Sequence, residues 1–177
     1  MSYSYQQDHV VIRSIERSDT PNVLAWRNHP DVRKNLIQDA EITEAGHTHW
    51  LEQFVDTGKC HQFVIESDGT PVGCVFLKSI EPDQHKAEFG IFMSPTAHGK
   101  GIGTIAACLI LQHGFEVLGL ERIYLCVFAN NPGAIRSYEK VGFQHEGMFR
   151  KDFWRNGESY DMVHMAILRD EWRKAAG

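Results

Sequence analysis

Three features that would narrow the function of this chain are missing from its sequence. No run of about 18 apolar residues is present, which is the length a helix needs to cross a bilayer. The first 9 residues are polar, unlike the apolar centre of a signal peptide. The 4 cysteines and 10 histidines include no Cys-x-x-Cys pair and no His-Glu-x-x-His motif. We therefore expect no membrane association, no metal site, and histidines scattered over the surface.

The sequence also lacks a stripe rich in lysine and arginine, and its formal net charge is −5 at pH 7. This balance argues against a nucleic-acid partner and is compatible with a cationic acceptor. The cysteines lie in apolar segments, which is typical of reduced, mostly buried thiols and predicts a cytoplasmic protein. They are Cys60, Cys74, Cys108 and Cys126.

A length of 177 residues with 42% hydrophobic and 23% charged residues predicts one domain over residues 1–177, with its core at about 9–170. Apolar patterns predict strands at 10–15, 62–66, 72–78, 88–93 and 122–128, and two more around the turn Asn156-Gly157. Helices are predicted after Ser18 with an interruption at His29-Pro30, after Thr43, over 104–117, between Asn131 and Gly142, and from Arg169. Strands joined by short turns and covered by helices indicate a mixed α/β (α+β) fold.

The segment 98–104 reads HGKGIGT and stands between a predicted strand and a predicted helix. Its three glycines, Gly99, Gly101 and Gly103, leave the backbone without Cβ atoms at alternate positions. Backbone amides at a helix N-terminus bind anions, and the helix dipole adds to that attraction. The segment therefore predicts a site for a phosphorylated ligand.

Three other interpretations of this loop compete. A P-loop requires Ser or Thr directly after the Lys, but Gly101 follows Lys100. A Rossmann dinucleotide loop fits from Gly101 to Ala106, yet Glu121 precedes a predicted strand where the ribose-binding acid should end one. A tight turn without a ligand needs only one glycine. The last two interpretations remain alternatives.

A second motif follows between Asn131 and Phe143. Asn131 is a good N-cap, Pro132 suits the first helical position, and Gly142 is a typical helix stop. The spacing reads N-x-x-A-x-x-x-Y-x-x-x-G-F, with Ala134 and Tyr138 on one face of the helix.

With these two motifs in this order, the chain resembles the GCN5-related N-acetyltransferases (GNAT) over roughly residues 9–170. The pyrophosphate loop of that family reads Q/R-x-x-G-x-G/A, and here His98 replaces the Gln or Arg. The resemblance implies a GNAT-like single domain with a mostly antiparallel, mixed, twisted sheet of about six to seven strands and about four helices. It also implies acetyl-CoA as cosubstrate, held by Ile91, Phe92, Met93, His98, Gly99, Lys100, Gly101, Ile102, Gly103, Thr104, Asn131 and Ala134.

The resemblance gives two residues catalytic roles. Tyr138 is expected to donate a proton to the departing CoA thiolate, because a free phenol with pKa ~10 is protonated at neutral pH. The alternative is a core aromatic. Glu88 is expected to hold the acceptor ammonium or take its proton, directly or through water. The alternative is a surface glutamate paired with Lys86.

The acceptor is expected near the broken helix, at Trp26, Arg27 and Asn28, together with Glu88. A tryptophan in the core is the alternative. Residues 87–168 resemble spermidine acetyltransferases, whereas residues 26–31 resemble aminosugar acetyltransferases, and the acidic patch of spermidine enzymes is missing after Asn35.

We therefore expect an acetyl-CoA-dependent N-acetyltransferase that needs no metal and acts on a small primary amine such as an amino sugar or a polyamine. A protein N-terminal acetyltransferase of the ribosomal-protein type, or a non-catalytic CoA- or nucleotide-binding module, remains an alternative. The expected assembly is a homo-oligomer, with a dimer favoured.

Overall fold

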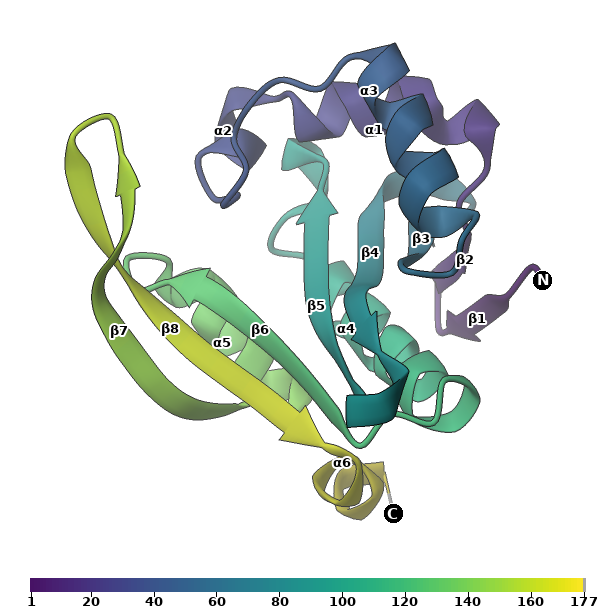
Figure 1. The fold of residues 1–177 in the computed structure, drawn as a ribbon. Helices are drawn as coiled ribbons and strands as arrows, with labels where there is room; N and C mark the ends of the chain where they lie inside the picture. Colours follow the sequence, from purple (N-terminus) through teal and green to yellow (C-terminus); the bar gives the residue numbers. More distant parts are fainter. Residues whose placement is uncertain (177) are drawn as a thin grey trace.

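The computed structural model describes residues 1–176, which form one eight-stranded sheet and six α-helices (Figure 1). The strand order across the sheet is β1-β2-β3-β4-β5-β6-β8-β7. The strands are β1 (Ser4–Gln7), β2 (Val10–Ser14), β3 (His61–Ser67), β4 (Thr70–Glu81), β5 (Lys86–Met93), β6 (Arg122–Phe128), β7 (Gln144–Arg155) and β8 (Glu158–Leu168). The helices are α1 (Thr20–Arg27), α2 (Pro30–Arg33), α3 (Glu44–Trp50), α4 (Ile102–Gln112), α5 (Pro132–Val141) and α6 (Arg169–Ala176). α3 and α4 continue as π-helical turns over Leu51–Val55 and His113–Val117.

The fold class expected from the sequence is confirmed, while both element counts were too low. The additional strand, β1, lies in the polar N-terminal segment, where Tyr5 is its one half-buried side chain, and it pairs with β2 as an edge strand. The helix count exceeds the four that the resemblance implied because His29-Pro30 divides one predicted helix into α1 and α2, and because the helix predicted from Arg169 forms as α6.

All neighbouring strands are antiparallel except β5 and β6. This parallel pair covers three residue pairs, Lys86↔Arg122, Ala87↔Ile123 and Glu88↔Tyr124. Beyond Glu88 and Tyr124 the two strands diverge, as Figure 1 shows between the upper ends of β5 and β6. The sheet is therefore open on one side of its centre.

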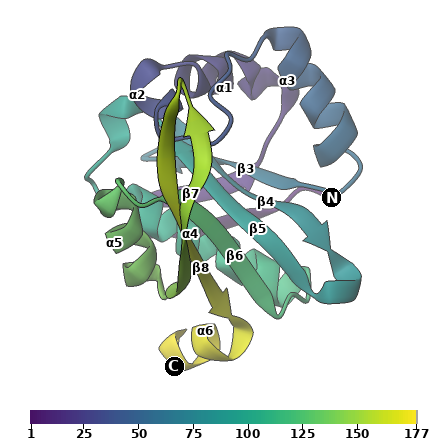
Figure 2. The same ribbon diagram turned by 60° about the vertical axis from the view of Figure 1, so that its left-hand side comes forward.

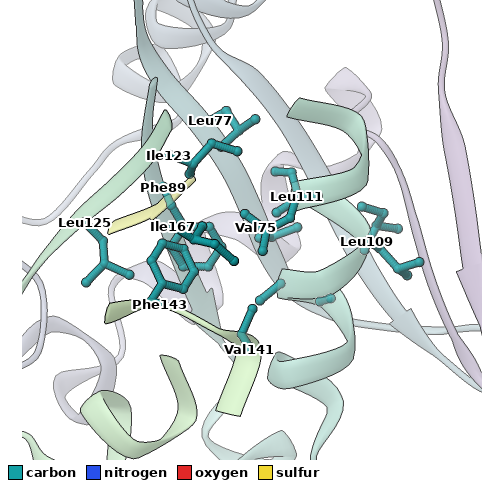
Figure 3. Packing of buried hydrophobic residues seen from close by; sticks show 14 of the residues in the cluster. Val75, Leu77, Phe89, Leu109, Leu111, Ile123, Leu125, Val141, Phe143 and Ile167 are labelled. Carbon is teal, nitrogen blue, oxygen red and sulfur yellow. The ribbon is translucent and has the colours of Figure 1, made fainter. Parts of the chain in front are cut away.

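Helices cover both faces of the sheet because side chains of alternate strand residues point to opposite faces. The larger core lies under α4, where Val75 and Leu77 of β4 meet Leu111 (Figure 3). On the other face, Val64, Cys74 and Phe92 of the sheet pack against residues of α1 and α2. The two cores fix α4 and α1 on opposite sides of the opening between β5 and β6.

The β7–β8 hairpin extends past the sheet, and both views place its tip beside the segment that follows α2 (Figures 1 and 2). Arg155, near that tip, donates hydrogen bonds to the carbonyl oxygens of Lys34 at 3.3 Å and Ile37 at 3.1 Å. The hairpin thus holds the segment 34–41, called the acceptor loop below, although the two are far apart in sequence. None of the helices formed by residues 1–176 combines the length and apolarity that crossing a bilayer requires.

The expectation that the histidines lie on the surface was wrong for two of them. His113 is 0% exposed and His47 is 3% exposed. His113 can be buried because both ring nitrogens have partners: Nδ1 lies 2.8 Å from the Tyr5 hydroxyl and Nε2 lies 2.8 Å from His61 Nδ1. A hydrogen-bonded imidazole loses little by leaving water, since its polar atoms are satisfied.

Candidate active site

A cleft of about 1180 Å³ occupies the opening between β5 and β6. It exceeds the ~300–1,000 Å³ typical of small-ligand pockets. Its walls come from α1, α3, the acceptor loop, β4, β5, the start of α4, β6 and α5. Residues distant in sequence therefore meet at the point where the sheet opens.

The glycine loop meets this cleft at the N-terminus of α4. Gly99 and Gly101 have φ angles of 76° and 75°, a conformation that other residues rarely adopt. A Cβ atom built on either glycine would meet nothing within 4 Å, so the backbone faces open space. Gly101 is the N-cap of α4, whose first amides have no partner within the helix. The loop has the geometry of an anion site, which fits the phosphates of a CoA molecule.

Gly103 has a different role from the other two glycines. The helix begins at Ile102 and not at Thr104, so Gly103 lies within its first turn. A Cβ atom on Gly103 would lie 3.3 Å from Met93 Sδ and 3.7 Å from Ile91 Cδ1. Gly103 therefore permits close packing of α4 against β5. Unlike Gly99 and Gly101, it does not have a positive φ angle.

The cleft brings together eleven of the twelve residues that the sequence assigned to acetyl-CoA, and Lys100 is the one that does not line it. Two basic residues that the sequence analysis did not select, Arg136 and Lys140, line the same region from α5. They stand four residues apart on the helix that carries Tyr138 and so lie on one face of it. This i, i+4 spacing is the sequence pattern that could have identified them. Their charge suits a phosphorylated ligand.

Asn131 joins the two sides of the cleft. Its Oδ1 accepts a hydrogen bond of 3.2 Å from the Ala134 amide, which caps α5 as the motif predicts. Its Nδ2 donates to Asn35 Oδ1 at 3.4 Å, across 96 residues of sequence. One side chain thus starts the helix of the cosubstrate side and contacts the acceptor loop.

Tyr138 lines the cleft from α5 and packs edge-on against Phe89, with ring centroids 5.7 Å apart. A second edge contact joins it to Phe143 at 6.0 Å. Burial raises the pKa of Tyr138 to about 12, so its phenol is protonated at neutral pH. The aromatic packing and the capacity to donate a proton occur together.

Glu88 lies in the cleft wall at the last position where β5 pairs with β6. Its Oε1 is 3.2 Å from Lys78 Nζ, and Lys78 stands directly opposite Glu88 on β4. The alternative prediction, that Glu88 pairs with Lys86, was wrong, because Lys86 Nζ lies 3.4 Å from Glu81 Oε1 instead. Lys78 also lines the cleft, and only the β4–β5 register could have identified it.

Of the three residues near residue 27 that were expected to bind the acceptor, the structure places one in the cleft wall and two behind it. Arg27 lines the cleft, whereas Trp26 is 8% exposed in the core beneath α1 with Val23 and Phe92. The Asn28 side-chain amide makes two hydrogen bonds of 2.8 Å with the Ile42 backbone: Nδ2 donates to the carbonyl oxygen, and Oδ1 accepts from the amide. Trp26 and Asn28 thus support the wall that presents Arg27.

Arginines organise the acceptor loop through its carbonyl oxygens. Arg33 Nε donates to the Asp39 carbonyl at 2.6 Å, and Arg27 Nη2 donates to the Gln38 carbonyl. The Arg155 side chain, described above, adds contacts from the β7–β8 hairpin and lies 3.0 Å from Asp39 Oδ2. The acceptor side of the cleft is therefore built by polar contacts more than by apolar packing.

Among residues 1–176, no group of three or more metal-binding side chains occurs together. The cleft wall presents a phenol, the carboxylates of Glu41 and Glu88, backbone amides and cationic side chains.

Comparisons with known proteins agree with this geometry. A family model described as an acetyltransferase (GNAT) domain matches residues 9–144. The chain is 32% identical over 163 residues to spermidine N(1)-acetyltransferase of Escherichia coli (strain K12), covering 92% of this chain and 88% of that protein. It is 30% identical over 162 residues to the L-amino acid N-acetyltransferase AaaT of the same organism, covering 90% and 98%.

Solved structures of acetyltransferases also match the fold of this chain. The spermidine N-acetyltransferase from Vibrio cholerae, in complex with CoA and spermine, matches with a TM-score of 0.88 and 26% identity over 94% of this chain and 99% of that one. A dodecameric structure of that enzyme matches with a TM-score of 0.82 and 26% identity over 97% of this chain and 100% of that one.

Proposed function

Since this chain belongs to the acetyltransferase (GNAT) family, we propose that the cleft between β5 and β6 is the site at which it moves an acetyl group from acetyl-CoA to the primary amine of a small molecule. The chain is an acetyl-CoA-dependent N-acetyltransferase. The observation that carries the site proposal is the convergence, in one cleft, of the glycine loop, Tyr138 and Glu88.

Backbone groups form most of the proposed cosubstrate site. Amides of the glycine loop at the N-terminus of α4 hold the pyrophosphate, assisted by Arg136 and Lys140. β5 continues to Met93 although its pairing with β6 stops at Glu88. On the edge of β5 that faces away from β4, residues 91–93 have no strand partner, so backbone groups there can hydrogen-bond an extended ligand in place of a strand. The Met93 carbonyl on this segment lies 3.3 Å from His98 Nε2. The backbone groups of this edge orient the pantetheine arm, and bound acetyl-CoA supplies the activated acetyl group.

Two side chains transfer protons in the proposed reaction. An alkyl amine with a pKa of ~10 is mostly protonated at neutral pH and must lose its proton before it attacks a thioester. The Glu88 carboxylate holds the ammonium and accepts that proton, directly or through water. The Tyr138 hydroxyl then donates a proton to the departing sulfur. The Lys78 ammonium, 3.2 Å from Oε1, holds the Glu88 side chain in place until the acceptor arrives.

The acceptor is a small amine, and an amino sugar or a polyamine remains our proposal for its class. The spermidine N(1)-acetyltransferase relative supports the polyamine. The arginine-held acceptor loop, with no free acidic patch after Asn35, favours a different amine. Acetylation of a protein N-terminus is the second candidate, and it would use the same cleft.

We further propose that residues 1–177 act as one domain and assemble as a homo-oligomer in the cytoplasm. Free cysteines support a reducing compartment. The exposed Met148, Phe149 and Trp154 on strand β7 support an interface between subunits. Because a structural relative is dodecameric, the assembly is not limited to a dimer. Light scattering after size exclusion measures it.

Thiol release from acetyl-CoA tests the function. A panel of polyamines, amino sugars and N-terminal peptides should identify at least one acceptor whose turnover falls in Tyr138→Phe and Glu88→Gln. Arg17→Gln is the matched control, because Arg17 is 58% exposed and pairs with Asp56 outside the cleft. Tight acetyl-CoA binding without turnover of any amine would indicate a non-catalytic module.

A further inference from the structure

Two buried nitrogen atoms in the cleft wall lack a hydrogen-bond partner among residues 1–176: Arg27 Nη1 and His47 Nε2. A buried polar atom without a partner costs about 1–3 kcal/mol, so proteins rarely retain one without a reason. Arg155 Nε also lacks a well-aligned hydrogen bond, but it lies 3.0 Å from the Asp39 carboxylate, which matches its charge. Arg27 and His47 are thus the two unmatched groups.

His47 is held so that one ring nitrogen is engaged and the other is not. It is 3% exposed on α3, and its Nδ1 lies 3.0 Å from Thr20 Oγ1 of α1. Burial lowers the pKa of His47, partly opposed by the charge of Asp19, so the ring is neutral at neutral pH. When the Thr20 hydroxyl donates to Nδ1, the proton of the ring is on Nε2, which becomes a free donor.

Arg27 is a cation without a matching anion. Its Nη2 donates to the Gln38 carbonyl, while Nη1 is free, and no ion pair joins it to a carboxylate among the described residues. Burial lowers the pKa of Arg27, and the charge of Arg33 adds to this effect, while the Asp39 carboxylate, which is paired with Arg155 at 3.0 Å, opposes it. An arginine remains protonated at neutral pH. The positive charge of the Arg27 guanidinium is therefore not matched by a carboxylate paired with it.

The carboxylates of the cleft wall cannot supply that charge. Those of the lining residues are Glu41, which lies 3.0 Å from Arg33, and Glu88, which lies 3.2 Å from Lys78. A polyamine has a second ammonium group, which would require a free carboxylate here. The wall instead has free donors on α1 and α3, two helices that pack against each other.

We propose that the acceptor carries an oxyanion, a carboxylate or a phosphate, in addition to its amine, and that Arg27 and His47 bind it. The inference rests on the proposed acetyl transfer and names the acceptor class for that site. An oxyanion accepts hydrogen bonds from both free nitrogens, and its charge balances the guanidinium. Amino acids and phosphorylated amino sugars belong to this class, and spermidine does not.

Matched acceptor pairs test the charge requirement. Glucosamine 6-phosphate is compared with glucosamine, and L-serine with 2-aminopropane-1,3-diol, which replaces the carboxylate by a hydroxymethyl group. Spermidine is the cationic reference. We expect kcat/KM for the anionic member of at least one pair to exceed that of its neutral partner and of spermidine by about tenfold or more. Equal values, or faster spermidine turnover, would overturn the inference, and the successful pair identifies carboxylate or phosphate.

Variants test the two residues. Arg27→Gln and His47→Leu should each raise KM for the anionic acceptor about tenfold or more, and by a larger factor than they raise KM for its neutral partner. Arg27→Lys, which keeps the charge, should recover part of the loss. Arg17→Gln is again the control, and thermal unfolding confirms that each variant is folded. An unchanged KM in folded Arg27→Gln would contradict the proposal.

The two proposals can fail separately. Turnover of amines without preference for an anion would reject the acceptor class and keep acetyl transfer. Absence of turnover with every amine would reject the proposed function. In that case calorimetry of glucosamine 6-phosphate and L-serine with the CoA-loaded protein still decides, because binding that is weakened in Arg27→Gln supports the anion site, and absence of binding rejects it.

Discussion

Glu88 and Tyr124 are the last residues to face each other across the parallel strands β5 and β6. The candidate base thus stands at the residue where the sheet begins to open. Beyond it, β5 keeps its antiparallel partner β4 as far as Met93 but has no partner in β6. The same interruption of the sheet therefore opens the cleft, leaves one edge of β5 without a strand partner, and places Glu88 where that open edge begins.

Tyr138→Phe should lower turnover while acetyl-CoA binding stays nearly intact. The change keeps the ring that packs against Phe89 and Phe143 and removes only the hydroxyl. A lost general acid predicts a decrease on the order of 10²–10⁴-fold in the chemical step. Single-turnover rates are the appropriate measurement, since another step can limit kcat. Wild-type single-turnover rates in this variant would leave Tyr138 with a packing role alone.

Gly101→Glu should weaken acetyl-CoA binding at least tenfold, because it places a carboxylate against the proposed pyrophosphate site. Gly58→Glu is a matched control: Gly58 has φ 73°, Gly101 has φ 75°, and a Cβ atom on either meets nothing within 4 Å. Both variants carry the same backbone strain, but Gly58 lies outside the cleft. Calorimetry with acetyl-CoA measures the difference, and equal affinities in the two variants would contradict the loop assignment.

Gly90→Ala should destabilise the fold and disturb the cleft wall. A Cβ atom on Gly90 would lie 2.2 Å from Phe76 Cε2, so the ring of Phe76 must move. Overpacking of this kind costs typically about 1–3 kcal/mol. Gly147→Ala on β7 is the control, because a Cβ atom there meets nothing within 4 Å. Urea unfolding compares the two, and similar stabilities would mean that Phe76 moves at little cost.

Stability should fall on mild acidification because of His113. Burial lowers its pKa to about 4, and the neighbouring His61 lowers it further in the same direction. An unfolded histidine has a pKa of ~6.5, so protons bind the unfolded state first as pH falls. The neutral ring thus contributes stability that is fully present above about pH 6.5 and is lost towards pH 4, by roughly 3 kcal/mol.

His113→Phe checks this linkage. The variant should show a flatter dependence of unfolding free energy on pH in that window, although its stability at neutral pH also falls through loss of the Tyr5 and His61 hydrogen bonds. His61 has a lowered pKa as well, so some slope remains. Replacement of the exposed His9 by Phe is the control. An unaltered slope in His113→Phe would remove His113 as the cause.

Local chemistry explains which parts could be predicted from the sequence. The helix α5 was predicted with its cap and its stop because Asn131 and Gly142 act on adjacent backbone groups. β1 was missed because it is a four-residue edge strand in which Tyr5 alone is half-buried, which is too short a pattern to show apolar alternation. Lys78 and His47 were missed for another reason. Their positions depend on a strand register and on helix packing, which no motif in a single sequence records.

The two ends of the cleft are built from different parts of the chain, and this division has a consequence for how such an enzyme changes. Helices α1–α3 and the acceptor loop all lie within the first 55 residues, whereas the glycine loop, Tyr138 and Glu88 come from residue 88 onward. New acceptors can therefore be acquired by exchange of one contiguous N-terminal piece, without a change in the grip on the cosubstrate. Arg155 sets the restriction, because any replacement segment must offer carbonyl oxygens where Lys34 and Ile37 now present theirs.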